Sequence, residues 1–189
     1  MRELSLNVMD IVQNSISAGA SLITIEVKES LPEDLLSISV TDNGCGMTKE
    51  QVEHVIDPFF TTRTTRSVGL GVPLFKMEAE MTGGSFVIDS EKGKGTALTA
   101  VFKPSHVDMI PLGDIEGTVQ LLISCNPDRD FLYHRTRKGP GGKEGDFTLD
   151  TRELREVLGG DVSLDNPEVV VWIKEFLEEQ TEELRNTTS

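Results

Sequence analysis

The sequence predicts an α/β protein, because segments with helical periodicity alternate along the chain with segments of strand periodicity. Apolar residues at spacings of three and four between residues 4 and 12 indicate an amphipathic helix. Apolar and polar residues alternate strictly in 23–28 and in 36–41, which is typical of half-buried strands. Two more strands are expected at 85–90 and 96–102, so the first hundred residues supply helices and a sheet for one core.

The composition is that of a soluble globular protein with an acidic charge balance. The chain has 189 residues, of which 37% are hydrophobic and 26% charged, and a formal net charge of −14. No basic patch stands out, so no nucleic-acid partner is expected. No run approaches the ~18 apolar residues of a membrane helix and the N-terminus is not a signal peptide, so no membrane partner is expected either. The two cysteines, Cys45 and Cys125, lack metal-ligand spacing, which favours a reducing cytoplasm.

The turn at 42–47, Asp-Asn-Gly-Cys-Gly-Met, follows the second strand directly. The two-residue period of a strand places Asp42 on the same face as Ile38 and Val40, so its carboxylate points toward the core side where the strand ends. A buried carboxylate needs hydrogen-bond donors. An amine on a flat apolar ring would supply one, and the glycines would let that ring come close. A type I′ hairpin turn is the alternative, since Asn-Gly is a common turn pair.

A polar stripe lies on the first helix beside the apolar one. It consists of Asn7, Asp10, Asn14 and Ser17, and Gly19 is expected to end the helix. Carboxylate and amide oxygens are the hard ligands that suit Mg²⁺, which takes one or two protein ligands and completes its shell with phosphates and water. Asn14 and Asp10 are therefore candidate oxygen donors. A solvated polar helix face is the alternative.

Residues 48–55 predict a short helix, because Thr-Lys-Glu-Gln at its start is a capping box. The next segment, 57–62 with the sequence Asp-Pro-Phe-Phe-Thr-Thr, fits neither a strand nor a helix and is interpreted as an aromatic anchor at the base of a mobile loop. Arg63 and Arg66 lie in that loop, where they can reach an anionic ligand. A surface loop with an aromatic plug is the alternative.

Gly69-Leu70-Gly71 leads directly into a helical segment that continues to Met81. Pro73 suits the first turn of that helix, and Gly83 stops it. Glycines before a helix N-terminus form a phosphate site, because free N–H groups and the positive end of the helix dipole face the anion there. Ordinary turns and helix caps have the same pattern. The sequence contains no Walker A, Rossmann or nucleophile-elbow motif.

The order of these segments resembles that of one family. The segments are Asp-Ile-Val-Gln-Asn-Ser at 10–15, Asp-Asn-Gly-Cys-Gly-Met at 42–47, Asp-Pro-Phe-Phe-Thr-Thr at 57–62, Gly-Leu-Gly at 69–71 and Gly-Lys-Gly-Thr at 93–96. They are similar to the successive boxes of the GHKL superfamily ATP-binding domain, found in histidine kinases, anti-sigma-factor kinases, MutL and gyrase B. The resemblance covers about residues 1–104. It implies a two-layer α/β sandwich of the histidine kinase-like ATPase (Bergerat) type, with a left-handed βαβ connection and ATP held between helices and sheet.

Transferred position by position, the resemblance implies a site for ATP and Mg²⁺. Asp42 would bind the adenine amine, and Asn14 would hold Mg²⁺. Arg63 stands where the family often has a basic residue facing the γ-phosphate, and Asp10 stands at the position of the general base, so these two are the candidate catalytic residues. The other candidate nucleotide-binding residues shape the adenine pocket or the lid: Gly44, Gly46, Met47, Phe60, Thr61, Thr62, Gly69, Leu70, Gly71, Val72 and Thr96.

Two departures from the family pattern bear on catalysis. Hydrolytic and anti-sigma members carry Glu at the position of Asp10, so the shorter side chain either acts as the base or orients a metal-bound water. The first box also begins at once, which leaves no room for a dimerisation helix pair with a phosphoacceptor histidine. His54, His106 and His134 are expected to be structural or exposed. A phosphoacceptor is therefore expected on another chain, that of a protein partner.

Residues 106–189 follow the ATP-binding region, taken as 1–105, as an acidic extension without an enzyme motif. Its expected elements, in ββαα order, are strands at 117–124 and 131–137, a helix at 150–158 and a helix opened by Asn166 and Pro167. The basic run that starts at Arg135 is expected to form a flexible loop up to Gly145, and Cys125 is expected to be buried. The extension is small for an independent core, so it is expected to pack on the sheet or on a partner.

Three functions are compatible with these features. The first is a Mg-ATP-binding regulatory protein that transfers or hydrolyses the γ-phosphate in a complex with a partner protein, as a kinase or slow ATPase. The second is a nucleotide-sensing module without turnover, in which ATP closes the lid and changes the affinity for a partner. The third, a MutL-like mechanical ATPase, is disfavoured by the acidity, the short length and the lack of a transducer domain.

Overall fold

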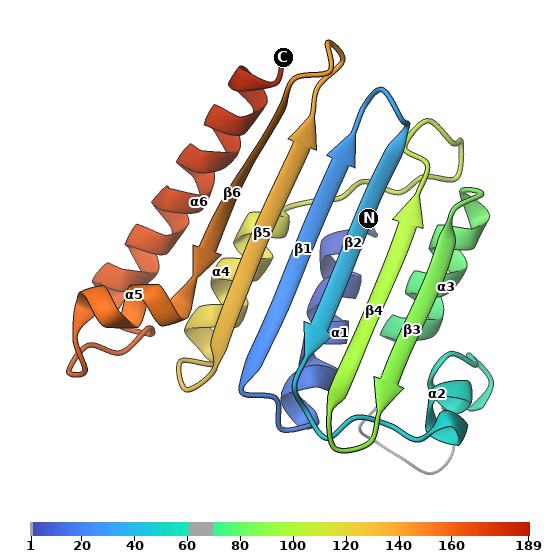
Figure 1. The fold of residues 1–189 in the computed structure, drawn as a ribbon, viewed down its shortest axis with the longest axis horizontal. Helices are drawn as coiled ribbons and strands as arrows, with labels where there is room; N and C mark the ends of the chain where they lie inside the picture. Colours follow the sequence, from blue (N-terminus) through green and yellow to red (C-terminus); the bar gives the residue numbers. More distant parts are fainter. Residues whose placement is uncertain (1, 61–69) are drawn as a thin grey trace.

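The structure is a computed structural model that describes residues 2–60 and 70–189 (Figure 1). In chain order, the helices and strands of these residues are α1 (Leu4–Ser17), β1 (Leu22–Ser30), β2 (Leu35–Asp42), α2 (Lys49–Val55), α3 (Gly71–Met81), β3 (Ser85–Glu91), β4 (Gly95–Phe102), α4 (Ile115–Cys125), β5 (Asp130–Lys138), β6 (Glu144–Asp150), α5 (Thr151–Leu158) and α6 (Pro167–Thr187). Every helix and strand expected before residue 105 is therefore present.

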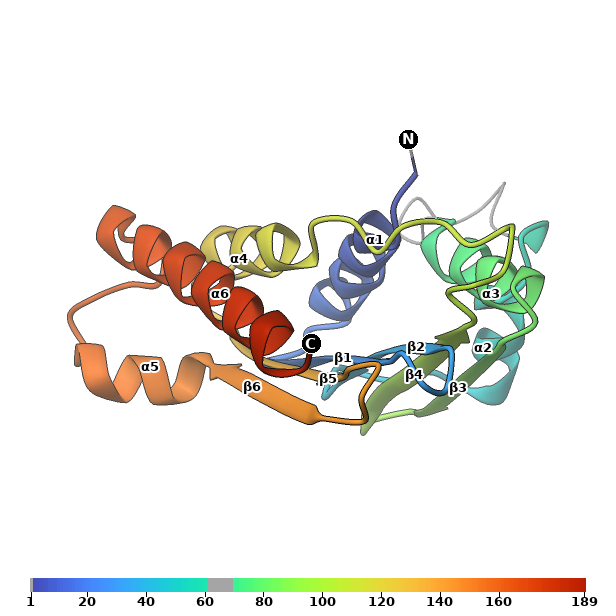
Figure 2. The same cartoon turned by 90° about the horizontal axis from the view of Figure 1, so that it is seen from above.

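The described strands form one sheet in the order β3-β4-β2-β1-β5-β6. β1 and β5 pair in parallel, and the other neighbours pair antiparallel. Helices α1, α3, α4 and α6 lie on one face of this sheet (Figure 2). The arrangement is a two-layer α/β sandwich, which confirms the predicted fold class.

The core lies between α1, α3, α4 and α6 and the face of the sheet that they cover. Alternate residues of the two central strands are buried: Ile23, Ile25, Val27, Leu36, Ile38 and Val40. The apolar stripe predicted on the first helix is buried as well: Leu4, Val8, Ile11 and Val12. Burial of such side chains is the main favourable contribution to folding, so the helix and strand periodicities together specify how the two layers face each other.

The predicted helix starts are confirmed for α2 and α3. Thr48 caps α2 through both bonds of the capping box, since the Gln51 N–H donates to its hydroxyl and its own N–H donates to the Gln51 side chain. Pro73 lies in the first turn of α3. Gly83 follows the end of α3 with φ +76°, a left-handed conformation that glycine adopts at little cost.

The predicted order of elements in the extension is wrong in two places. Residues 117–124 belong to helix α4 rather than to a strand, because the Asp114 carboxylate accepts a hydrogen bond from the Gly117 N–H and caps the helix. Residues 135–138 belong to β5, which contains the strand expected at 131–137, so the predicted loop is confined to 139–143. β5 pairs with β6, which the sequence analysis missed. The Arg135 side chain is buried, whereas Cys125 is exposed, the reverse of the expectations for both residues.

The extension continues the sheet of the first hundred residues. β5 pairs with β1 over the full length of both strands, with Leu22 opposite Asp130 and Ser30 opposite Lys138. The segment between Phe102 and α4 contains no helix or strand. No helix in the part of the chain that the structure describes is long and apolar enough to cross a membrane.

Candidate functional site

A cavity of about 560 Å³ lies at the end of the sheet where β2 stops and α2 begins. This volume falls in the range of small-molecule sites. Its apolar lining comes from α1, α2, α3 and the sheet: Ile11, Ala18, Val40, Val55, Val72, Ile88 and Leu98. Its polar lining consists of Asn14, Ser15, Ser17, Asp42, Gln51, His54 and Thr96. A large flat apolar group with a few polar atoms at its edge fits such a surface.

Asp42 is the carboxylate of this cavity and the last residue of β2. One of its oxygens accepts a hydrogen bond from the Ser15 hydroxyl at 2.6 Å, and the other accepts one from the Gly44 N–H at 2.9 Å. These two donors fix the plane of the carboxylate, while each oxygen keeps acceptor capacity for a ligand. The half-buried side chain is therefore oriented before any ligand arrives.

The glycines after Asp42 are required by close backbone approaches. A Cβ at Gly46, which has φ +65°, would lie 2.0 Å from the Glu91 carbonyl oxygen. A Cβ at Gly44 would lie 2.9 Å from the Cβ of Ala18. The Cys45 N–H donates to the Ala18 carbonyl at 2.9 Å, so the turn is fastened to the end of α1. Only glycine fits at these two positions without moving the neighbouring chain.

Thr96, one of the predicted nucleotide-binding residues, lies directly opposite Asp42 in the register of β2 and β4. Its hydroxyl is 2.8 Å from that of Ser90, and the Ser90 hydroxyl accepts a hydrogen bond from the Met47 N–H at 2.8 Å. Ser90 thereby connects β3 to the segment that leads into α2. The polar groups behind the carboxylate thus form one connected network.

Asn14 is the candidate metal ligand, and its half-buried side chain lines the cavity from α1. One amide oxygen is enough protein contribution for Mg²⁺ when phosphates and waters complete the shell, so the residues present fit this ion. Among the described residues there is no cluster of three or more His, Cys, Asp or Glu side chains that could hold a metal by themselves. A metal at Asn14 would therefore depend on an anionic ligand bound in the same cavity.

Asp10 lies one helical turn before Asn14 and does not line the cavity. Its side chain is exposed, and the first residue of α3 packs against it, since a Cβ at Gly71 would lie 2.7 Å from the Asp10 Cβ. The start of α3 is thus in direct contact with α1. The same two helices are joined by Asn7, which donates a hydrogen bond to the Glu78 carboxylate. Burial raises the pKa of Glu78 above its ordinary value of 4.5, although Arg2 and the bond from Asn7 act in the opposite direction.

The structure brings seven of the predicted site residues together on the cavity wall: Asn14, Asp42, Gly46, Met47, Phe60, Val72 and Thr96. Four other described residues of the prediction do not line it: Asp10, Gly44, Leu70 and Gly71. The remaining four lie outside the described residues: Thr61, Thr62, Arg63 and Gly69. The predicted adenine-side residues are thus mostly assembled, and the described part of the cavity is built by α1, β2, α2, α3, β3 and β4.

Sequence reasoning missed two kinds of cavity residue. The first is Ser15, the hydroxyl donor to Asp42, which follows Asn14 and lies one turn after Ile11 on the same helix face. The second is His54, which was expected to be structural or exposed and which lines the cavity. Its ring stacks on that of Phe60, with 3.7 Å between centroids and an interplanar angle of 12°. This stack holds the Phe60 ring against α2.

Comparison with known proteins identifies the family. Residues 2–106 match the family described as "Histidine kinase-, DNA gyrase B-, and HSP90-like ATPase". Sensor kinase CckA of Brucella abortus (strain 2308) is 27% identical in an alignment over 169 residues, and the match covers 75% of this chain and 17% of that protein. Sensor histidine kinase WalK of Bacillus subtilis (strain 168) is 36% identical in an alignment over 97 residues, and the match covers 48% of this chain and 16% of that protein. The chain therefore spans about one sixth of the length of these relatives.

A solved structure supports the same fold. The crystal structure of the N-terminal domain of a DNA repair protein superposes with a TM-score of 0.54 at 16% sequence identity and covers 85% of this chain and 58% of that chain. The family match covers more than half of the residues, and the GHKL resemblance of the sequence motifs is thereby confirmed. The chain belongs to the histidine kinase-, DNA gyrase B- and HSP90-like ATPase family.

Proposed function

We propose that the cavity binds ATP together with Mg²⁺, and that the chain transfers or hydrolyses the γ-phosphate in a regulatory complex with a partner protein. The observation that carries this proposal is the position of Asp42. Its carboxylate is oriented by Ser15 and Gly44 and lies on the wall of an otherwise largely apolar cavity. A purine amine supplies the donor that such a carboxylate requires, and the apolar residues contact the ring faces.

The phosphates are assigned to the side of the cavity where α1 faces the start of α3. Asn14 lines the cavity there, and Val72 lines it from the first turn of α3. The N–H groups of that first turn have no partner within the helix, so they and the positive helix end favour an anion. Mg²⁺ held by Asn14 and the phosphates would neutralise phosphate charge during transfer. Arg63 and the threonines after Phe60 lie outside the described residues, and their phosphate contacts stay an expectation from the family resemblance.

The role of Asp10 distinguishes a protein that turns ATP over from one that only senses it. As a general base it would take a proton from the attacking water or hydroxyl, or from a water that it orients. Its position beside Gly71, outside the cavity lining, favours a second candidate function in which ATP is bound and sensed without turnover. In that case the nucleotide would act by changing the affinity for the partner.

The partner is proposed to carry the phosphoacceptor. The relatives CckA and WalK are named a sensor kinase and a sensor histidine kinase, and this chain corresponds to about one sixth of each. No histidine of this chain is proposed as the acceptor: His54 stacks on Phe60 in the cavity wall, His106 accepts a hydrogen bond from the Asp108 N–H, and His134 lies in β5 near Glu26 and Asp146. In this proposal, the γ-phosphoryl group passes from ATP to an acceptor side chain of the partner.

The test is incubation with γ-labelled ATP and Mg²⁺, alone and with a cell lysate. Wild-type protein is expected to release labelled phosphate or to label one partner. Asp10→Asn is expected to lower that rate at least tenfold with little change in ATP affinity, because the carboxylate acts on the attacking water or hydroxyl and not on the bound nucleotide. Gln13→Ala, at an exposed position of the same helix outside the cavity lining, serves as the control. Saturable ATP binding without any loss of γ-phosphate would support sensing instead.

A further inference from the structure

The loop between α1 and β1, residues 18–21, lies between the glycine turn and the loop that connects α4 to β5, residues 126–129. All three loops are at the same end of the sheet (Figure 1). Ala18 lines the cavity, and it is covalently continuous with the residues that contact the extension. The loop 18–21 therefore connects the cavity to the C-terminal part of the chain.

The contacts on the cavity side use the glycine turn. The Ala18 carbonyl accepts from the Cys45 N–H at 2.9 Å. The Asn43 side-chain oxygen accepts from the N–H groups of Ser21 at 2.8 Å and Leu22 at 3.0 Å, and its amide donates to the Ser21 hydroxyl at 2.9 Å. The turn that carries Asp42 is thus aligned by the loop 18–21 and the start of β1, because Asn43 and Cys45 of the turn both bond to this segment.

The contacts on the other side come from the extension. The Arg129 guanidinium donates to the carbonyl of Ala20, a residue with no exposed surface. The Asp130 N–H donates to the Ser21 carbonyl at 2.8 Å. Hydrogen bonds from a charged donor are stronger than those between neutral groups. Arg129 is therefore the main side-chain contact that holds the loop from this side.

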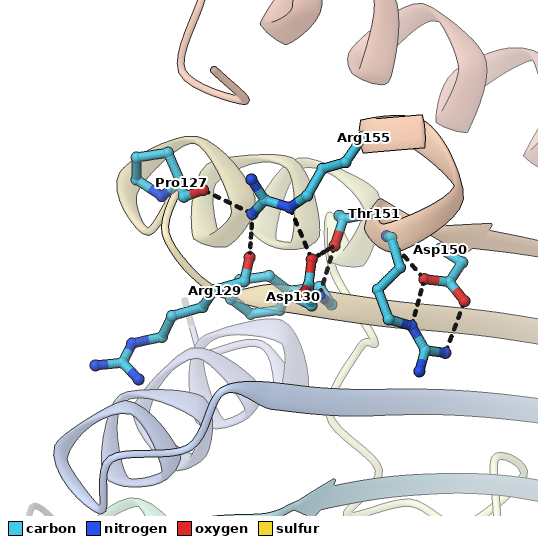
Figure 3. Close-up of polar contacts among 8 residues, drawn as sticks. Pro127, Arg129, Asp130, Asp150, Thr151 and Arg155 are labelled. Atoms are coloured by element: carbon cyan, nitrogen blue, oxygen red, sulfur yellow. Dashed lines mark hydrogen bonds and ion pairs between the residues drawn. The ribbon is translucent and has the colours of Figure 1, made fainter. Parts of the chain in front are cut away.

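Arg155 on α5 holds the 126–129 loop in turn (Figure 3). Its Nη2 donates to the carbonyls of Pro127 at 2.7 Å and Arg129 at 2.8 Å, and its Nε donates to the Asp130 carboxylate at 2.8 Å. The Thr151 hydroxyl donates to the same carboxylate oxygen at 3.0 Å. One guanidinium thus bonds to two carbonyls of the loop, including that of Arg129, and to the first residue of β5.

We propose that Arg129 and Arg155 are positioning residues for the nucleotide, through which the C-terminal extension sets the affinity of the cavity for ATP. They hold the loop 18–21 against the glycine turn, so that Ala18 and Asp42 keep the spacing that a purine ring requires. Neither residue lines the cavity. The inference rests on the proposed function for its ligand, and on the hydrogen bonds of the described residues for its mechanism.

A matched pair of variants on α5 tests the proposal. Arg155→Ala removes the bonds to the 126–129 loop, whereas Arg152→Ala removes an arginine of the same helix whose guanidinium bonds to Asp150 at 2.8 and 3.0 Å. Two quantities are measured on the full chain: hydrogen–deuterium exchange of segments 18–22 and 43–45 without ligand, and the dissociation constant of Mg-ATP by calorimetry. Arg155→Ala is expected to speed exchange in both segments and to weaken ATP binding, each by about threefold to tenfold, and Arg152→Ala to match the wild type.

The outcomes separate the two claims. If Arg155→Ala exchanges faster only in 126–130, or binds ATP as tightly as Arg152→Ala, the positioning role is overturned. If the wild type binds no ATP, the proposed function fails, and the exchange measurement still accepts or rejects the link between α5 and the glycine turn. If Arg155→Ala unfolds, Arg129→Gln removes the contact to the Ala20 carbonyl while keeping Arg155, and the same two measurements apply. Arg155→Lys is expected to restore part of both effects, since a single ammonium replaces only some of the bonds.

Discussion

Two regions of this molecule share one sheet but use their polar groups differently. Around the cavity, the Asp42 carboxylate is oriented by two donors and keeps acceptor capacity toward an open space. In the extension, the Glu116 carboxylate accepts from the Arg135 guanidinium and from the Tyr133 hydroxyl, both on buried residues. Burial and the adjacent Glu116 raise the pKa of Tyr133 above its usual range, so this group stays neutral. The first carboxylate keeps acceptor capacity for a ligand, whereas the second is occupied by donors of its own buried cluster. We therefore expect chemistry in the first region and structural support in the second.

Breaking the buried Glu116–Arg135 ion pair is expected to have the largest effect on stability. Glu116→Ala leaves Arg135 as a buried charge without its carboxylate, and the free energy of unfolding is expected to fall by about 3–5 kcal/mol. Glu29→Ala breaks a more exposed pair, with Arg137, and is expected to cost about 1 kcal/mol or less. Urea denaturation of both variants measures the difference. Equal losses would show that the extension does not depend on its buried ion pair.

The glycine turn gives the next largest effect. Gly46→Ala combines a positive φ with a Cβ 2.0 Å from the Glu91 carbonyl oxygen, whereas Gly93→Ala has φ +87° but no atom within 4 Å. Both variants pay the conformational cost of about 1–2 kcal/mol for a non-glycine residue, and only Gly46→Ala must also move the turn. Thermal unfolding is expected to show a loss of stability in both variants, and ATP calorimetry to show reduced affinity in Gly46→Ala alone. Unchanged ATP affinity in that variant would separate the turn from the binding site.

The junction of α1 and α3 gives the smallest effect and a defined pH dependence. The folded pKa of Glu78 is raised above 4.5, so the folded state binds more protons than the unfolded state between 4.5 and the raised value. The stability contributed by the protonated form is therefore lost as the pH rises through this window. Denaturation measured from pH 4 to 7 is expected to show this decline in the wild type and not in Glu78→Gln, which keeps an acceptor for Asn7. The same decline in both proteins would assign it to other groups.

The same contrast explains how far the sequence could be interpreted. Around the cavity the information is local: strand alternation carries Asp42 to the core side, and the capping box at Thr48 and the glycines at 69–71 mark helix starts. Ser15 could not be predicted, because nothing in the neighbouring sequence indicates that its hydroxyl bonds to the distant Asp42. Local patterns therefore predicted the order of the elements and several residues of the cavity wall.

In the extension the deciding contacts are distant or ambiguous. Residues 117–124 are a short apolar run rich in residues that suit strands, and such a run does not separate strand from helix; the cap at Asp114 was the missed signal. Arg135 reads as part of a basic loop, but the period of a strand turns it inward to Glu116, 19 residues upstream. β6 contains a glycine and three acidic residues, and only pairing with β5 makes it a strand.

The most direct test of the cavity assignment compares ATP with inosine triphosphate, which carries a carbonyl where adenine carries the amine. Calorimetry with Mg²⁺ is performed on the wild type and on Asp42→Ala. The wild type is expected to bind ATP about 10- to 100-fold more tightly than inosine triphosphate, because a carbonyl cannot donate to the carboxylate, and the preference is expected to fall to about twofold in Asp42→Ala. Equal binding of the two nucleotides by the wild type, or an undiminished preference in Asp42→Ala, would contradict the assignment of Asp42 to the purine amine.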